Sequence, residues 1–189
     1  MPDPPLIMQN PAIQDVPMSV ILRQATGPTD MTAARKCLEA YTQWLDEDIS
    51  FQNYTQELSD LPGKYSLPSG ALLLAVDSTS GNILGCIAMR PLRIEPTYLL
   101  NRQPDARYCE IKRLFVYPEA RGKQVARLLI HEVLRRAEEQ GYDEALLDTM
   151  AKMQAAVRLY ASEGFQETSP YYYNPLNGAL YMSKRLSKV

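Results

Sequence analysis

The spacing of apolar positions in the first half of the chain predicts two helices among three strands, with the last two strands forming an antiparallel hairpin. Asp30 is the expected N-cap of the first helix, and apolar residues recur at helical spacing from there to Leu45. Pro62-Gly63 is expected to end the second helix. In chain order, the predicted strand, two helices and two strands cover Ser19–Gln24, 30–45, Tyr54–Leu61, Ala71–Val76 and Ile83–Met89.

The second half alternates strand and helix before it closes with two strands. A strand that returns to the same sheet through a helix is parallel to the strand before it, and its crossover is right-handed. The sequence therefore predicts an α/β fold in which a mixed, partly antiparallel central sheet has helices on both faces. The predicted elements are a strand, a helix, a strand, a helix and two strands, at Arg107–Val116, Val125–Ala137, Asp143–Thr149, Met153–Ser162, Phe165–Thr168 and Ala179–Lys184.

The alternation of apolar positions slips by one residue in the predicted strand Arg107–Val116. Ile111 stands at an odd position, whereas Leu114 and Val116 stand at even positions. If all three side chains face the same core, the strand contains a bulge near Lys112-Arg113. If both faces of the strand are buried, the slip has no structural meaning. The sequence leaves these two alternatives open.

Composition and charge exclude several classes of protein. The chain has 189 residues, of which 46% are apolar and 22% charged, and its net charge is −2. Such a balance gives no reason to expect nucleic acid or an anionic membrane as a partner. The longest apolar run has six residues, 71–76, and a membrane-spanning helix needs about 20. The oligomeric state is not predicted.

The sequence predicts one domain, 19–189, preceded by an extended arm, 1–18, which carries five prolines and no basic residue. This composition is unlike that of a secretory signal. Three cysteines and one histidine are too few for a disulfide framework or a typical metal site. We therefore expect reduced thiols, a cytoplasmic location and no metal.

A turn rich in basic residues follows the strand that ends at Val116 and precedes the helix that begins near Val125. The first turn of a helix has free amide donors and the positive end of the helix dipole, so it suits a phosphate or diphosphate. Gly122 lets the backbone approach an anion closely. Arg121, Lys123 and Arg127 add positive charge. A solvated basic helix start explains the same residues, and these residues alone do not decide between the two.

This segment resembles the signature of the GNAT superfamily of N-acetyltransferases, R/Q-x-x-G-x-G/A after a strand of the form L-x-V-x-P. The matching residues are Leu114–Pro118 (LFVYP) and Arg121–Ala126 (RGKQVA). Glu110-Ile111 before the strand end, Leu159-Tyr160, and Gly164-Phe165 follow the family pattern in the expected order. The resemblance extends from about Val20 to the C-terminus and implies a splayed central strand.

The resemblance implies that acetyl-CoA is the co-substrate and an amine is the acceptor. The amides of the signature turn would bind the diphosphate, and the edge of the splayed strand would pair with the pantetheine arm. The fourth signature position is a glycine in the family and Gln124 here, so its side chain is expected to point away from the phosphates. The implied cofactor-binding residues are Leu114, Phe115, Val116, Arg121, Gly122, Lys123, Gln124, Val125 and Ala126.

Two catalytic residues are implied by position. Glu110 stands where several relatives keep a carboxylate base, which an alkylamine needs because its pKa of about 10.4 leaves it protonated near neutral pH. An ordinary strand carboxylate paired with Lys112 or Arg107 is the alternative. Tyr160 matches the tyrosine that protonates the leaving thiolate, and a core aromatic residue is the alternative. The resemblance implies direct transfer without an acyl-enzyme.

Several aromatic residues are candidates for the acceptor pocket. Trp44, Phe51 and Tyr54 are candidate walls, although core packing explains Trp44 equally well. The three tyrosines 171–173 cannot all point inward on an extended segment, because successive side chains alternate faces.

The leading hypothesis is an acetyl-CoA-dependent N-acetyltransferase that acts on a primary amine of unknown identity. A CoA-binding sensor without turnover is the main alternative, and a module that binds an acidic protein is a further one.

Overall fold

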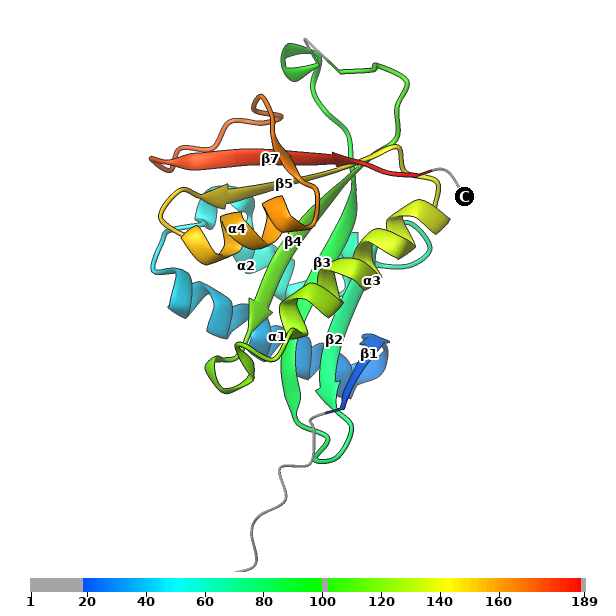
Figure 1. Ribbon diagram of the computed structural model, residues 1–189, viewed down its shortest axis with the longest axis vertical. Coiled ribbons are helices and arrows are strands. Elements are labelled where there is room, and N and C mark those ends of the chain that lie inside the picture. The colour runs from blue at the N-terminus through cyan, green and yellow to red at the C-terminus, as the bar shows by residue number, and fades with distance from the viewer. Residues whose placement is uncertain (1–18, 100–101, 188–189) are drawn as a thin grey trace, which may run out of the picture.

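The computed structural model describes residues 19–99 and 102–187, so the predicted arm at 1–18 lies outside the described residues. A seven-stranded sheet runs through the molecule in the order β1-β2-β3-β4-β5-β7-β6 (Figure 1). Only the β4–β5 pair is parallel among its neighbouring strands. The strands are β1 (Val20–Gln24), β2 (Ala71–Asp77), β3 (Ile83–Leu92), β4 (Tyr108–Val116), β5 (Glu144–Met150), β6 (Gln166–Glu167) and β7 (Ala179–Arg185).

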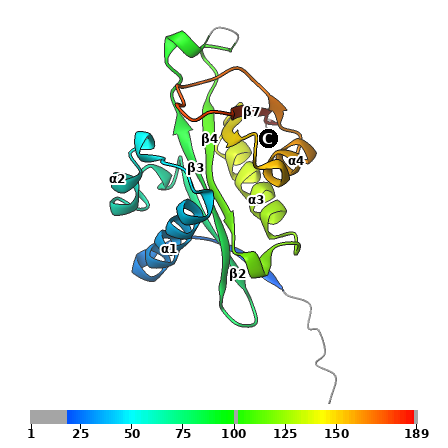
Figure 2. The same cartoon turned by 90° about the vertical axis from the view of Figure 1, so that its left-hand side faces the viewer.

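Helices cover both faces of this sheet (Figure 2). Helices α1 (Gly27–Leu45) and α2 (Tyr54–Ser59) lie on one face, and α3 (Val125–Glu139) and α4 (Gln154–Ser162) lie on the other. The sheet therefore has two cores, and β2 is buried from Ala71 to Val76 because side chains of both faces are covered. The predicted fold class is confirmed. None of the helices in the described part of the chain has the length and apolar character needed to cross a membrane.

The predicted cap of α1 is wrong. The helix begins at Gly27 with Pro28 in its first turn, and Thr26 is the N-cap residue. Asp30 lies within the first turn, where its carboxylate accepts a hydrogen bond from the Thr26 amide at 2.9 Å and pairs with Arg23 at 2.8 Å. A carboxylate at this position still accepts a hydrogen bond from a free amide and interacts favourably with the positive end of the helix dipole. An acidic residue one turn into the helix is therefore easily mistaken for the N-cap residue in the sequence.

Of the two alternatives that the sequence left open for β4, the structure shows the bulge, and it also buries both faces of the strand. Between Cys86 and Ala88 of β3 the pairing register shifts, so that β4 has one extra residue. Arg113 occupies this bulge with φ +60°, in the left-handed region. The slip in the apolar pattern is its consequence, because Ile111 and Leu114 contact the same core on the α3 side.

A buried ion pair holds the bulge against α2. Nε and Nη2 of Arg113 donate to the two carboxylate oxygens of Glu57 at 2.7 and 2.9 Å. Lys64 pairs with the same carboxylate at 2.7 Å, and the Tyr65 hydroxyl donates to it at 2.8 Å. The side chains of Arg113 and Glu57 are each only 2% exposed. The pair ties the extra residue of β4 to a helix that is far away in the sequence.

Strands β4 and β5 pair over a short stretch at one end and then separate. They pair only from Tyr108–Glu144 to Glu110–Leu146, and from there the two strands diverge into an open V (Figure 1). A bulge bends its strand, so the extra residue at Arg113 directs the rest of β4 away from β5. The edge of β4 that faces β5 is unpaired with that strand from residue 111 onward.

We expect Glu57→Gln to lower the free energy of unfolding by about 3–5 kcal/mol, because the Arg113 guanidinium then remains buried without a counter-charge. Urea titration at neutral pH measures this change. Glu47→Gln is the control, since it removes a carboxylate from a surface pair with Lys152 and should cost less than about 1 kcal/mol. Equal, small effects of the two variants would contradict the importance of the buried pair.

The pH dependence of stability provides a second measurement on the same variant. Burial raises the pKa of Glu57, but the hydrogen bonds and charges of Arg113 and Lys64 outweigh it and lower the pKa to about 2. In the unfolded chain the pKa is about 4.3. The carboxylate therefore stabilises the fold fully above about pH 5, and this contribution is lost as the pH falls towards 2. Glu57→Gln should flatten that acid dependence.

Candidate active site

The turn between β4 and α3 exposes a set of free amide groups. After β4 the chain makes one 3-10 turn, Pro118–Ala120, and reaches α3 through Gly122 and Gln124, which have φ +76° and +64°. Within the described part of the chain, no acceptor receives a hydrogen bond from the amides of residues 122–127. Six N–H groups at the positive end of a helix form a site for an anion.

Most residues of the predicted signature meet at this turn. Six of them line a cavity of about 240 Å³ together with Leu159 of α4. Gln124 is exposed and lines this cavity, and the expectation that its side chain points away from the phosphates stays a prediction. The six signature residues are Val116, Arg121, Gly122, Gln124, Val125 and Ala126.

The basic side chains of the turn are engaged elsewhere. Arg121 donates to the Val116 carbonyl at 3.1 Å and stacks on Trp44, 5.1 Å from the ring centroid. Arg127 pairs with Glu163 at 2.8 Å. Trp44 is 47% exposed and does not line the cavities described below, so the prediction that it walls the acceptor pocket is wrong. The anion site therefore relies mainly on backbone amides.

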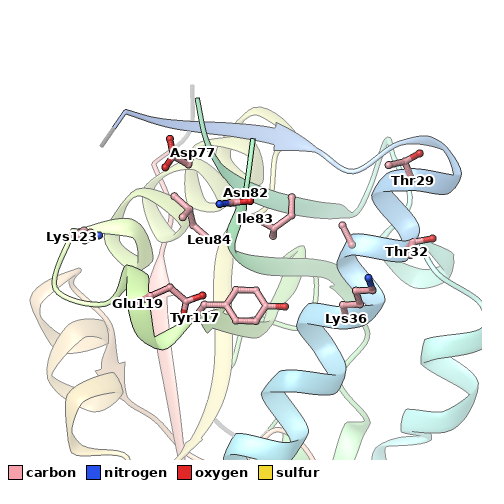
Figure 3. A pocket seen from close by; sticks show the side chains of 11 residues that line it. Thr29, Thr32, Lys36, Asp77, Asn82, Ile83, Leu84, Tyr117, Glu119 and Lys123 are labelled. Carbon is pink, nitrogen blue, oxygen red and sulfur yellow. The ribbon is translucent and has the colours of Figure 1, made fainter. Parts of the chain in front are cut away.

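Lys123 faces a different cavity from the other signature side chains. This cavity, of about 860 Å³, lies between α1, the β2–β3 hairpin and the 3-10 turn after β4 (Figure 3). Lys36 and Tyr117 also line it, and their side chains point towards each other in Figure 3. Neither Tyr160 nor Glu110 is among its lining residues. Only the backbone of Lys123 belongs to the signature turn.

The open V between β4 and β5 forms a narrow cleft. Leu114, Asp148 and Met153 line it, together with Tyr160 of α4. The Phe115 side chain points to the opposite face and packs on Tyr117 with a centroid separation of 5.0 Å. Of the predicted strand residues, Phe115 can therefore present only its backbone to the cleft.

Tyr160 has the surroundings of a proton donor. It is 8% exposed, its ring packs on Phe165, and its hydroxyl has no hydrogen-bond partner among the described residues. Burial raises the pKa of Tyr160 well above its ordinary value, and the nearby Tyr41 and Asp148 act in the same direction. The hydroxyl is therefore protonated throughout the physiological pH range and lies in the wall of the cleft.

A second cavity, of about 440 Å³, adjoins the cleft through Gln52 and Lys112, which line both. Glu110 lies in its wall and is 1% exposed. Its carboxylate accepts hydrogen bonds from Arg90 Nε at 2.6 Å, Lys112 Nζ at 3.1 Å and the Tyr171 hydroxyl at 3.0 Å. We call this space the acceptor cavity.

The surroundings of Glu110 favour its ionised form. Burial raises the pKa of its carboxyl, but the charges of Lys112 and Arg90 outweigh burial and lower the pKa to about 2. A carboxylate with three donors and such a pKa is a weak proton acceptor at neutral pH. Glu110 does pair with Lys112, as one alternative expected. It does not pair with Arg107, because the Arg107 side chain donates to the carbonyls of residues 140 and 141.

The sequence did not indicate a second carboxylate, Asp148, which comes from β5 on the other arm of the V. It accepts hydrogen bonds from the Tyr172 hydroxyl at 2.8 Å and Asn174 Nδ2 at 3.1 Å, and lies 3.4 Å from Lys112 Nζ. Lys112 thus bridges Glu110 and Asp148. No sequence motif marks Asp148, since β5 reads as an ordinary buried strand.

The aromatic candidates divide between the cavity and other places. Phe51 lines the acceptor cavity, whereas Tyr54 stacks on Arg113 at 5.4 Å. Tyr171 is 2% exposed and Tyr173 is 75% exposed, so the prediction that the three consecutive tyrosines cannot all point inward is confirmed. Tyr172 lies between them, half-buried, with its hydroxyl on Asp148.

Comparison with known proteins identifies the family. The Acetyltransferase (GNAT) family matches residues 35–165. The structure of an acetyltransferase of the GNAT family from Staphylococcus aureus superposes with a TM-score of 0.68 and 18% identity, covering 89% of this chain and all of that one. The chain therefore belongs to the GNAT family of N-acetyltransferases, enzymes that transfer an acetyl group to an amine.

Two relatives at more than 30% identity match most of the chain. An uncharacterized N-acetyltransferase of Schizosaccharomyces pombe is 36% identical over 91% of this chain and 98% of its own length. Another from Dictyostelium discoideum is 32% identical over 71% of this chain and 84% of its own length. A phosphinothricin acetyltransferase of Sinorhizobium meliloti, solved in complex with acetyl-CoA, has a TM-score of 0.62 and 18% identity, with 89% of each chain covered.

We expect Gln124→Gly to tighten acetyl-CoA binding by up to about fivefold, since a left-handed non-glycine residue costs about 1 kcal/mol and the variant holds the turn more readily in its present conformation. Calorimetric titration measures the Kd. Gly122→Ala is the converse control: a Cβ there meets nothing within 4 Å, so it adds backbone strain alone and should weaken binding. Weaker binding by Gln124→Gly would mean that the glutamine side chain contacts the ligand.

Proposed function

We propose that this protein transfers the acetyl group of acetyl-CoA directly to a primary amine. The observation that carries the proposal is the row of free amides at residues 122–127, placed at the end of a β4 edge that β5 leaves unpaired. The first feature suits a diphosphate and the second suits an extended arm with amide groups. The adjoining acceptor cavity leaves room for the amine.

The residues that would hold acetyl-CoA are those of the turn and the strand edge. The amides of residues 122–127 would bind the diphosphate, and the backbone of Leu114, Phe115 and Val116 would pair with the pantetheine arm. Acetyl-CoA supplies a thioester, which is an activated acetyl group with a thiolate leaving group. A backbone amide oriented at the thioester oxygen would contribute about 2.7–4 kcal/mol to transition-state stabilisation.

Tyr160 is proposed as the acid that protonates the departing thiolate. Its hydroxyl is protonated, is free of other hydrogen bonds, and lies across the cleft from Leu114. The pKa of a thiol is about 8.5, below that of this buried phenol. This transfer is unfavourable on its own, so the hydroxyl would donate a hydrogen bond to the sulfur as the carbon–sulfur bond breaks, and the resulting tyrosinate would regain the proton that the attacking nitrogen releases.

We propose that Glu110 acts mainly by positioning the side chains that donate hydrogen bonds to it. The acceptor amine must lose a proton, and a carboxylate with a pKa of about 2 removes it only weakly. Its three hydrogen bonds instead hold Arg90, Lys112 and Tyr171 in the wall of the acceptor cavity. The proton can leave through water in this open cavity. The role of direct base, expected from the family resemblance, remains a prediction.

A CoA-release assay tests the proposal against a CoA-binding sensor. The purified chain is mixed with acetyl-CoA and a panel of primary amines, and free thiol is measured. We expect release that depends on the amine. A sensor would instead show a rise in Tm with acetyl-CoA and no release with any amine.

The cellular location is proposed from the thiols. Cys37, Cys86 and Cys109 are free and buried, which agrees with a reducing compartment. Burial also raises the pKa of Cys109, so this thiol is not a reactive nucleophile. We propose a cytoplasmic enzyme.

We expect Tyr160→Phe to lower kcat about 10²-fold, in the range of a lost general acid, with less than a twofold change in the Kd of acetyl-CoA. Stopped-assay kinetics and calorimetric titration measure the two quantities. Tyr142→Phe is the control, because this hydroxyl bonds the Ser69 carbonyl outside the cleft. Unchanged kcat in Tyr160→Phe would remove the acid assignment.

We expect Glu110→Gln to lower kcat/KM by about 10-fold or more at every pH between about 6.5 and 9.5, a factor of 10 being about 1.4 kcal/mol. A positioning residue gives a wild-type to variant ratio that is constant across this range. A direct base gives a ratio that is largest at low pH and approaches one as the amine loses its proton unaided. Glu144→Gln, at the closed end of the V, is the control and should keep the wild-type profile.

A further inference from the structure

Cationic side chains outnumber carboxylates among the residues that line the acceptor cavity, and two further carboxylates, Glu57 and Asp148, pair with Lys64 and Lys112 from just outside this lining. Four cationic side chains and two carboxylates line it. One of the carboxylates, Glu110, is 1% exposed and already accepts three hydrogen bonds, so it offers little to a ligand. The cations are Lys64, Arg90, Arg93 and Lys112, and the second carboxylate is Glu95.

Arg90 retains donors that no protein group uses. Its Nε binds Glu110, whereas its two Nη atoms have no hydrogen-bond partner among the described residues. Lys64 makes one ion pair, to Glu57 at 2.7 Å, and can donate two more hydrogen bonds. Both side chains are 32% exposed, and both line the acceptor cavity and the smaller cavity beside it. A guanidinium edge beside an ammonium group matches a carboxylate.

An unpaired acceptor lies on Gln52, which lines the acceptor cavity and, together with Arg90 and Lys64, the smaller cavity beside it. Oε1 of Gln52 is buried and has no hydrogen-bond partner in the described structure, although Nε2 of the same side chain donates to the Tyr172 hydroxyl at 3.4 Å. Gln52 lines both the acceptor cavity and the cleft. A buried acceptor without a donor is costly, and here it stands where an attacking amine must pass.

The remaining wall of the cavity is aromatic. Such a surface suits an apolar group on the acceptor, because ring faces bury apolar area without losing hydrogen bonds. The aromatic residues are Phe51, Tyr98, Tyr171, Tyr172 and Tyr173.

We infer that the acceptor is a primary amine that also carries a carboxylate, such as an apolar α-amino acid. Arg90 and Lys64 bind the carboxylate, and Gln52 Oε1 accepts a hydrogen bond from the amine at the entrance to the cleft. This inference rests on the proposed acetyl transfer and specifies its substrate class. A polyamine is disfavoured in the same cavity, because its charges would add to those of Lys64, Arg90 and Lys112.

The test compares matched amines in the CoA-release assay with the full chain and acetyl-CoA. The panel contains L-phenylalanine, L-leucine and L-methionine, their carboxamides, the corresponding amines without a carboxyl group, and spermidine. We expect kcat/KM for an acid to exceed that for its carboxamide at least 10-fold. The carboxamides lose their ammonium proton more readily, so reactivity alone favours them, and a preference for the acids must come from binding.

Variants assign the preference to residues. Arg90→Gln should reduce the acid-to-carboxamide ratio to near one, and Lys64→Met should reduce it severalfold. Arg185→Gln removes the same charge from an exposed position on β7 that lines none of these cavities, and it should leave the ratio unchanged. Gln52→Met should lower kcat/KM for acid and carboxamide alike without changing their ratio. A general loss of folding would lower all rates and leave the ratio intact.

The outcomes separate this inference from the proposed function. CoA release with equal or higher kcat/KM for carboxamides, simple amines or spermidine would overturn the inference and leave acetyl transfer standing. A ratio that survives Arg90→Gln would overturn the assignment of the carboxylate site. Binding of acetyl-CoA, seen as a rise in Tm, without release for any amine would overturn both proposals.

Discussion

The ion pair between Arg113 and Glu57 is the contact on which the site geometry depends. Arg113 has a left-handed backbone in the middle of a strand, a conformation that a side chain other than glycine adopts only when its surroundings compensate for the strain. The bidentate contact supplies that compensation from α2, and the Cys86 thiol donates to the Arg113 carbonyl at 3.3 Å. Gly85 allows the close approach, since a Cβ there would stand 2.3 Å from the Phe115 carbonyl oxygen.

The bulge decides which side chains of β4 face each of the two cores, and it lies where β4 and β5 have separated. Before it, β4 pairs with β3 and β5 and closes the sheet; beyond it, β4 follows β3 alone. Because the extra residue reverses the alternation, Leu114 faces the cleft while Phe115 packs under α1. The strand then ends at the signature turn, so the orientation of the free amides also depends on this single residue.

Local patterns predict the order and type of the elements and the position of the signature turn, since both depend on residues adjacent in the chain. The slip between Ile111 and Leu114 was compatible with the bulge, but it did not decide between a bulge and a strand buried on both faces. Asp148, Arg90 and Gln52 escaped prediction because three separate elements bring them to the site. The sequence also could not show that Glu110 is enclosed by Arg90 and Tyr171, contacts that span 20 and 61 residues.

Charge is distributed differently in the two halves of the site, and the difference follows from the chemistry each half must support. At the turn, the free amides would bind an anion without the help of a titratable side chain. In the acceptor cavity, full charges from Arg90 and Lys112 stand beside the place where an amine must be neutral to attack. Nearby cations lower the pKa of an amine, so they favour loss of its proton even though Glu110 is already saturated with donors. A carboxylate on the acceptor would then compensate the positive charge that an amine alone would meet.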